Sequence, residues 1–197
     1  MSHAAWPKPP RPWVPREPPP GGWVPRPKGQ PGGRPPAPGE LVRVQAFVNT
    51  ANLELAEDLL ATTDWFGDGG VDLRRAVAVR EALHAMLAHH GGAPFDRDAA
   101  ATLDAAARGA RITLRVDADG RTALRSADPL GDLLAIVHRA EATGTWARLK
   151  VCECDDCQYA FYDRSRNRSA VWCDMAVCGN REKVRAYRRR EAVHEHR

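Results

Sequence analysis

Between residues 72 and 90, apolar side chains recur at the spacing that places them on one face of an α-helix. The apolar positions are Leu73, Val77, Leu83, Met86 and Leu87. Gly91 and Gly92 follow them and predict the end of the helix. His89 and His90 stand in its last turn, where a partial positive charge interacts well with the helix dipole, so we expect both at the surface.

The pattern further along the chain predicts two more helices and one β-hairpin. An alanine-rich helix begins after Asp96 and stops at Gly109. Residues 110–126 alternate apolar and polar side chains on both sides of an Asp-Gly pair, which is typical of a hairpin with a tight turn. Asp128 is a good cap for a third helix, which runs to Gly144.

Residues 40–66 begin with β-branched and aromatic side chains and become helix-like near residues 55–60. Asn49 and Thr50 could cap a turn or a helix there. Taken with the elements that follow, this segment predicts a mainly α fold of the α+β class. The expected domain spans residues 40–145 and is helical, with one β-hairpin.

The first 39 residues hold fourteen of the sixteen prolines, six glycines and almost no aliphatic side chains. Such a segment cannot bury enough apolar surface to offset the entropy of ordering, so we expect a disordered, partly polyproline-like tail. The unit WVPR occurs twice in it, at residues 13–16 and 23–26. We interpret the repeat as low-complexity sequence, with a docking peptide or a nucleic-acid contact as the alternative.

Basic charge is concentrated near the C-terminus. Residues 164–190 hold nine basic and two acidic side chains, a net charge of +7, whereas the whole chain carries +4. Clustered Lys and Arg favour a polyanionic partner, and a solvated basic helix is the simpler alternative. No apolar run approaches the roughly 20 residues that cross a bilayer, and the N-terminus lacks the apolar core of a secretory signal. We therefore expect no membrane partner and a cytoplasmic chain, associated with the nucleoid if it binds DNA.

All five cysteines lie in one C-terminal segment. Cys152 with Cys157, and Cys173 with Cys178, form two C-x4-C pairs that could bring four thiolates to one tetrahedral metal. Cys154 also forms a C-x2-C pair with Cys157, so spacing alone leaves Cys152 and Cys154 as alternative ligands. In a reducing compartment, four thiolates favour one structural Zn²⁺ over disulfides, and the spacings differ from those usual for iron–sulfur clusters. No HExxH motif, phosphate-binding glycine loop or nucleophile elbow is present, so we predict no enzymatic activity.

Three runs in this part of the chain resemble the CGNR zinc-finger family: RLKVC at 148–152, FYDRSRNRS at 161–169 and WCDMAVCGNR at 172–181. Upstream, VQAFVNTANLE and VREALHAML are similar to the ABATE domain that normally precedes this finger. The resemblance implies a four-cysteine zinc finger with a basic terminal helix over residues 146–197. It also implies a stress-induced transcriptional regulator, whose DNA binding is inferred from the basic finger.

Carried over by motif, the resemblance implies that Cys152, Cys157, Cys173 and Cys178 bind the zinc, with Cys154 as the spare thiol. We expect Phe161, Tyr162 and Trp172 to cover the site, and a finger without a core of its own to depend on the metal for its fold.

The finger would present a basic loop and a basic helix to double-stranded DNA, with RNA or a protein as the alternative partner. The candidate nucleic-acid contacts are Arg164, Arg166, Asn167, Arg168, Asn180, Arg181, Lys183, Arg185, Arg188 and Arg189. Because phosphate contacts carry no sequence choice, base reading would fall to Asn167, Asn180 or one of the arginines. The helical domain would then act as a sensor or as a homodimerisation module.

Overall fold

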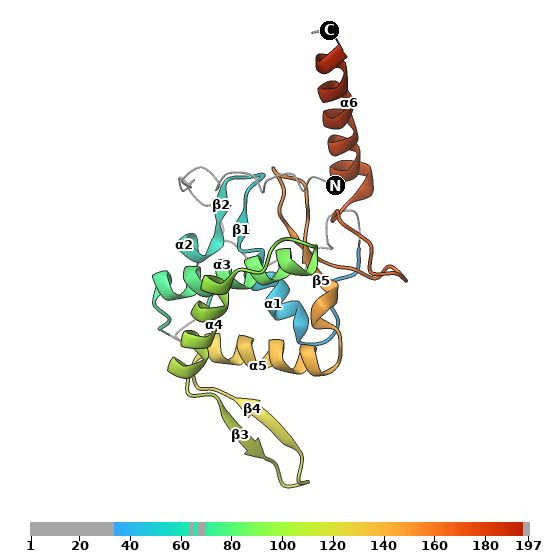
Figure 1. Cartoon of the computed structure of the whole chain (residues 1–197). Helices are drawn as coiled ribbons and strands as arrows, with labels where there is room; N and C mark the ends of the chain where they lie inside the picture. Colours follow the sequence, from blue (N-terminus) through green and yellow to red (C-terminus); the bar gives the residue numbers. More distant parts are fainter. Residues whose placement is uncertain (1–33, 64, 67–69, 195–197) are drawn as a thin grey trace.

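The computed structural model describes residues 34–63, 65–66 and 70–194, and most of the predicted tail, with both WVPR units, lies outside them. The helices are α1 (Leu41–Val48), α2 (Leu59–Thr62), α3 (Leu73–His90), α4 (Arg97–Gly109), α5 (Pro129–Ala142) and α6 (Asn180–His194). The strands form three antiparallel pairs: β1 (Ala51–Asn52) with β2 (Glu57–Asp58), β3 (Thr113–Val116) with β4 (Thr122–Arg125), and β5 (Leu149–Val151) with β6 (Ala160–Tyr162). Helix α6 extends from one end of the helical body and the β3–β4 hairpin from the other (Figure 1). None of the helices among the described residues is long and apolar enough to span a membrane.

The three helices predicted after residue 72 and the hairpin are confirmed. Each helix begins after an aspartate whose carboxylate accepts a backbone N–H of the first turn. Asp72 accepts from Arg75, and Asp96 accepts from Asp98 and Ala99. Asp128 accepts from Leu130, with Pro129 at the first helical position.

The interpretation of residues 40–66 was partly wrong. The β-branched segment from Leu41 forms helix α1, because Leu41, Val44 and Phe47 share one face that is buried in the core. The helix-like signal at residues 55–60 is a turn followed by strand β2, and α2 begins only at Leu59. The single predicted hairpin is joined by two further strand pairs, β1–β2 and β5–β6.

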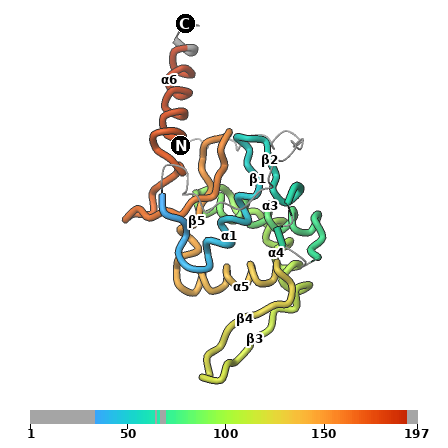
Figure 2. The backbone as a smooth tube through the Cα atoms, turned by 180° about the vertical axis from the view of Figure 1, so that it is seen from behind, coloured from blue at the N-terminus to red at the C-terminus, as the bar shows by residue number. Residues whose placement is uncertain are grey.

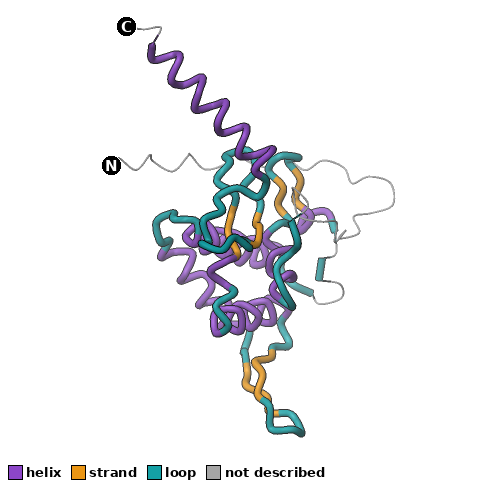
Figure 3. The backbone as a smooth tube through the Cα atoms, turned by 90° about the vertical axis from the view of Figure 1, so that its right-hand side faces the viewer, coloured by secondary structure: helices purple, strands orange, loops and turns teal. Residues whose placement is uncertain are grey.

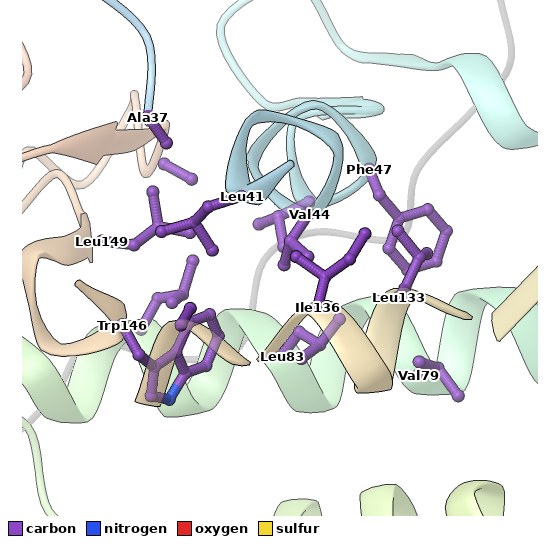
Figure 4. Close-up of a cluster of buried hydrophobic side chains, with 14 of the residues drawn as sticks. Ala37, Leu41, Val44, Phe47, Val79, Leu83, Leu133, Ile136, Trp146 and Leu149 are labelled. Carbon is purple, nitrogen blue, oxygen red and sulfur yellow. The ribbon is translucent and has the colours of Figure 1, made fainter. Parts of the chain in front are cut away.

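Helices α1, α3 and α5 enclose the main core. In Figure 4, Val44 and Phe47 of α1 lie beside Leu133 and Ile136 of α5, with Leu83 of α3 beneath them. Trp146 and Leu149 close the core on the side of the C-terminal segment (Figure 4). The predicted apolar face of α3 is confirmed at Leu83 and Leu87, both fully buried, but not at Leu73, which is 46% exposed.

The core continues from the helical domain into the C-terminal segment. Leu149 and Val151 of β5, and Ala160 and Tyr162 of β6, belong to the same buried cluster as the helices. Figures 2 and 3 show this strand pair against the helical body, at the base of the segment that leads to α6. The alternation of a strand then turns the remaining side chains, Lys150 and Phe161, towards the other side. One face of the β5–β6 pair therefore packs against the helical domain, and its other face belongs to the cysteine segment.

Candidate metal centre and nucleic-acid interface

The outer face of the β5–β6 pair carries the cysteine cluster. Phe161 is fully buried there in the same cluster as the five cysteines, and Trp172 and Tyr159 are partly buried and pack against this cluster. Phe161 and Trp172 thus lie where the sequence predicted, whereas Tyr162 does not. Its side chain points into the main core, because neighbouring residues of a strand face opposite sides.

Four sulfur atoms come together at this cluster. The Sγ atoms of Cys152, Cys157, Cys173 and Cys178 all lie within 4.8 Å of one another. The Cys157–Cys173 and Cys173–Cys178 Sγ distances are 3.6 Å and 3.7 Å. A tetrahedron of sulfurs around zinc, with Zn–S bonds of about 2.3 Å, has edges of about 3.8 Å. The four thiols therefore fit one tetrahedral zinc ion.

Cys154 is fully buried but lies outside this group of four. Its carbonyl oxygen accepts the backbone N–H groups of Cys157 at 2.9 Å and Gln158 at 3.1 Å. The residue therefore starts the tight turn that aims Cys157 at the other sulfurs. The geometry groups the same four cysteines that the two C-x4-C pairs and the family resemblance indicated.

The electrostatics of the four thiols favour a cation. Hydrogen bonds from the thiols of Cys157 and Cys173 lower the pKa of Cys152. The pKa of Cys173 is raised chiefly by its hydrogen bond to Cys152, and that of Cys178 chiefly by burial. The cluster by itself thus accommodates one negative charge readily and resists further ones. A divalent metal removes that resistance, because coordinated thiols are deprotonated.

Comparison with known families agrees with this geometry. The model of the CGNR zinc finger matches residues 148–191. The ABATE model, described as "Putative stress-induced transcription regulator", matches residues 39–145, more than half of the chain. The chain belongs to the ABATE family. Its CGNR finger holds one structural zinc ion, to which the four clustered cysteines offer their thiolates. No curated protein matches the chain.

The basic loop of the CGNR finger, residues 164–169, is held by a buried ion pair that the sequence did not reveal. Asp163 is fully buried, and its carboxylate accepts Lys150 Nζ at 3.0 Å. The same carboxylate accepts the backbone N–H groups of Ser165 at 2.8 Å and Ala170 at 3.0 Å. Lys150 Nζ also donates to the carbonyl oxygen of Arg168 at 2.5 Å. Both ends of the loop are thus tied to one charged pair.

These contacts also set the ionisation of Asp163. Burial alone would raise the pKa of its carboxyl group, but the hydrogen bonds from Ser165 and Lys150 outweigh that effect and lower it. The carboxylate of Asp163 therefore stays charged at neutral pH. A lysine between Leu149 and Val151 in a strand buried at every position was the available sequence signal.

The predicted contacts on the loop differ in their surroundings. Arg164 lies with its guanidinium 5.3 Å from the ring centre of Tyr162 and donates to the carbonyl oxygen of Pro36 at 2.9 Å. Arg166, Asn167 and Arg168 are exposed. Arg168 adopts a positive φ of 52°, a left-handed conformation that closes the loop.

The predicted contacts on α6 divide into two sets. Arg181 Nη2 lies 2.6 Å from Glu54 Oε1 of the ABATE domain, and Arg185 pairs with Asp156 and with Glu182. These ion pairs hold the start of α6 against the body and offset part of its charge. The remaining predicted residues of α6 are exposed: Asn180, Lys183, Arg188 and Arg189.

The start of α6 also explains Gly179 of the CGNR motif. A Cβ atom on this residue would lie 2.6 Å from Met175 Sδ and 3.2 Å from Trp172 Cε3. Glycine therefore allows Trp172 to close over the turn that carries Cys178.

Polar residues of the ABATE domain fasten the finger to it, and sequence reasoning missed their role. Gln45 of α1 and Asn49, the residue that follows α1, donate to the carbonyl oxygen of Ala160 at 3.0 Å and 2.9 Å. Asn49 Oδ1 also accepts the Ala160 N–H at 2.7 Å. Asn49 was predicted to cap a turn or helix near residues 55–60; it is instead the C-cap of α1, and Asp58 caps α2. Its bonds to β6 depend on residues more than a hundred positions away, which no local pattern could indicate.

Two histidines of α3 complete the attachment. His84 Nε2 lies 3.2 Å from the carbonyl oxygen of Gln158, and His90 Nδ1 lies 2.8 Å from that of Leu149. Burial is the main cause that lowers the pKa of both imidazoles. The expectation of a surface position is thus confirmed for His89 and wrong for His90, which packs edge-on against Trp146.

Proposed function

We propose that this member of the ABATE family is a DNA-binding transcriptional regulator, in which the CGNR finger contacts duplex DNA through its basic loop and helix α6. The observation that carries the proposal is that one zinc site fixes both basic elements. The basic loop joins Cys157 to Cys173, two of the four clustered cysteines, and α6 begins at Asn180, two residues after Cys178. The zinc would thereby set the angle between them.

The shape of α6 supports this role. The helix has 15 residues, a length of about 22 Å at a rise of about 1.5 Å per residue. In Figures 1, 2 and 3 it stands away from the body beyond its first turn. A helix free on several sides fits the major groove of B-DNA, which is about 12 Å wide.

The ion pairs suggest how the arginines share the task. Arg181 and Arg185 already have carboxylate partners, so they would hold α6 in position. The phosphate contacts would come mainly from Arg166, Arg168, Lys183, Arg188 and Arg189, which are exposed. Base reading would fall to Asn167, Asn180 or one of these arginines. The four-thiolate zinc leaves no open coordination position, so the proposal gives it no catalytic task.

Duplex binding as a function of salt tests the proposal. Each phosphate contact contributes about −0.9 to the slope of log affinity against log salt. We expect Arg166→Gln and Arg188→Gln each to weaken binding and to reduce the slope by about one contact. Arg121→Gln is the matched control, because it removes the same charge at the hairpin turn, at the opposite end from α6 (Figure 1).

Two outcomes would contradict the proposal. Duplex binding that does not respond to salt, or no binding to any duplex, would exclude phosphate contacts of this kind. Stronger binding to structured RNA or to single strands than to duplex DNA would favour an RNA-binding finger instead.

A further inference from the structure

The β3–β4 hairpin is the least covered element of the ABATE domain. All four residues of β3 are exposed, including Leu114 at 63% and Val116 at 65%. Within the described residues β3 pairs only with β4, so its other edge is open. Figures 1 and 2 show the hairpin extending from the body beside α4 and α5. A two-stranded hairpin is marginally stable alone, and an open apolar edge is a template for another strand.

The two faces of the hairpin differ in character. Leu114 stands opposite Leu124, and Val116 stands opposite Thr122, so these side chains share a largely apolar face. The other face carries Thr113, Arg115 and their partners on β4. A strand paired on the open edge of β3 would have to repeat this division between apolar and polar faces.

The open edge presents the backbone of alternate residues. The Asp117 N–H donates to the carbonyl oxygen of Arg121 at 2.9 Å, so the backbone of Asp117 faces β4. By the alternation of an antiparallel ladder, the backbone of Arg115 and Thr113 also faces β4. The N–H and C=O groups of Leu114 and Val116 therefore point to the open edge.

We propose that β3 pairs with β3 of a second copy of this chain, antiparallel, with Leu114 on the two-fold axis. In this register Leu114 meets its own copy, and Ile112 meets Val116 of the second copy. Thr113 meets Arg115 of the second copy. Beyond the ends of the strands, Arg111, which leaves the extended conformation with a φ of 49°, would lie near Asp117 of the second copy. Apolar side chains are thus opposite apolar ones, and basic side chains are opposite hydroxyl or acidic ones.

The neighbouring registers are unfavourable. Placing the axis at Arg115 sets two Arg115 side chains directly opposite each other. Placing it at Thr113 sets Arg111 opposite Arg115 of the second copy. Shifting one β3 strand by one residue against the other puts apolar side chains opposite polar ones. Like charges directly across an antiparallel pair destabilise it, so the arginines disfavour the axes at Arg115 and at Thr113.

The position of the hairpin is compatible with the rest of the molecule. It lies at the opposite end of the body from α6 in Figures 1, 2 and 3, so pairing there leaves both fingers uncovered. The paired strands would form a four-stranded antiparallel sheet with two-fold symmetry, an isologous interface.

The test is the oligomeric state of the full zinc-loaded chain, measured by sedimentation over a range of concentrations. We expect a dimer for the wild type. Leu114→Lys places two ammonium groups on the axis and should weaken dimerisation at least about tenfold. Leu124→Lys is the matched control, because it makes the same change on the same face but on β4, away from the proposed β3–β3 contact. It should remain dimeric. Circular dichroism checks that both variants stay folded.

A charge pair gives a second, independent measurement. Arg111→Asp opposes two carboxylates across the interface and should weaken the dimer. Adding Asp117→Asn should recover part of the loss, since the amide oxygen can still accept the Asp119 and Arg121 N–H groups of the turn. A wild type that stays monomeric at its highest soluble concentration overturns the proposal. So does equal weakening by Leu114→Lys and Leu124→Lys, which would indicate packing through the apolar face.

Discussion

Substituting alanine for Asp163 tests whether the buried Lys150–Asp163 pair organises the basic loop of the finger. The carboxylate is fully buried and accepts three hydrogen bonds, from Lys150 Nζ and from the N–H groups of Ser165 and Ala170, at 2.8–3.0 Å. Asp163→Ala removes all three. The lysine, whose side chain is 7% exposed, would then remain buried with only carbonyl partners.

The expected magnitude follows from that geometry. Removing one partner of a buried ion pair costs about 3–5 kcal/mol, because the other charge is left uncompensated. Lys150→Met should cost less, since the carboxylate keeps two backbone donors. The double variant, Lys150→Met with Asp163→Ala, should cost less than the sum of the two single changes by more than about 1 kcal/mol.

Denaturant unfolding at a fixed excess of zinc, followed by tryptophan fluorescence, gives the free energy of unfolding for each variant. Zinc content is measured alongside it, because the pair holds the loop and does not bind the metal. A cost below about 1 kcal/mol for Asp163→Ala, or strictly additive single changes, would refute the assigned role. The matched exposed control is Arg166→Gln, which should change stability by less than about 0.5 kcal/mol.

Three further predictions concern the metal, the pH and the packing. Cys154→Ser should retain one zinc per chain by elemental analysis and Cys152→Ser should not; the reverse result would make Cys154 the ligand. Burial lowers the pKa of His90 in the folded state, so the folded protein loses stability as the pH falls below about 6.5, the usual pKa of histidine. His90→Asn keeps a hydrogen-bond donor but cannot titrate, so it should lose less stability than the wild type between about pH 7.5 and about 5.5. An equal loss in the two proteins would contradict this. Gly131→Ala should destabilise the protein by about 1–3 kcal/mol, because the new Cβ would lie 2.7 Å from Ala110 Cβ. Gly109→Ala is the control and should be tolerated, because the nearest atom to its Cβ would be 3.9 Å away. Thermal unfolding compares the two variants, and equal melting temperatures would be inconsistent with this packing.

Local signals were sufficient for much of the ABATE domain. Asp72, Asp96 and Asp128 each cap a helix through a bond to an N–H group two or three residues away. The Asp-Gly turn likewise closes a hairpin whose partners are at most twelve residues apart. The two C-x4-C pairs, taken with the family resemblance, indicated the four cysteines whose sulfur atoms the structure groups. Interactions of this range can be recognised from the sequence around them.

Other features were decided only by the tertiary structure. The β-branched start of α1 forms a helix because the core selects one face of it, and local propensity is too weak to oppose that selection. Arg181 pairs with Glu54, and Asn49 with Ala160, across more than a hundred residues. The sequence alone determined the three capped helices after residue 72 and the Asp-Gly hairpin, and together with the family resemblance it indicated which thiols gather. Which charges are free to meet a partner depended on long-range packing, because an arginine beside a carboxylate and an arginine in water look the same in a sequence.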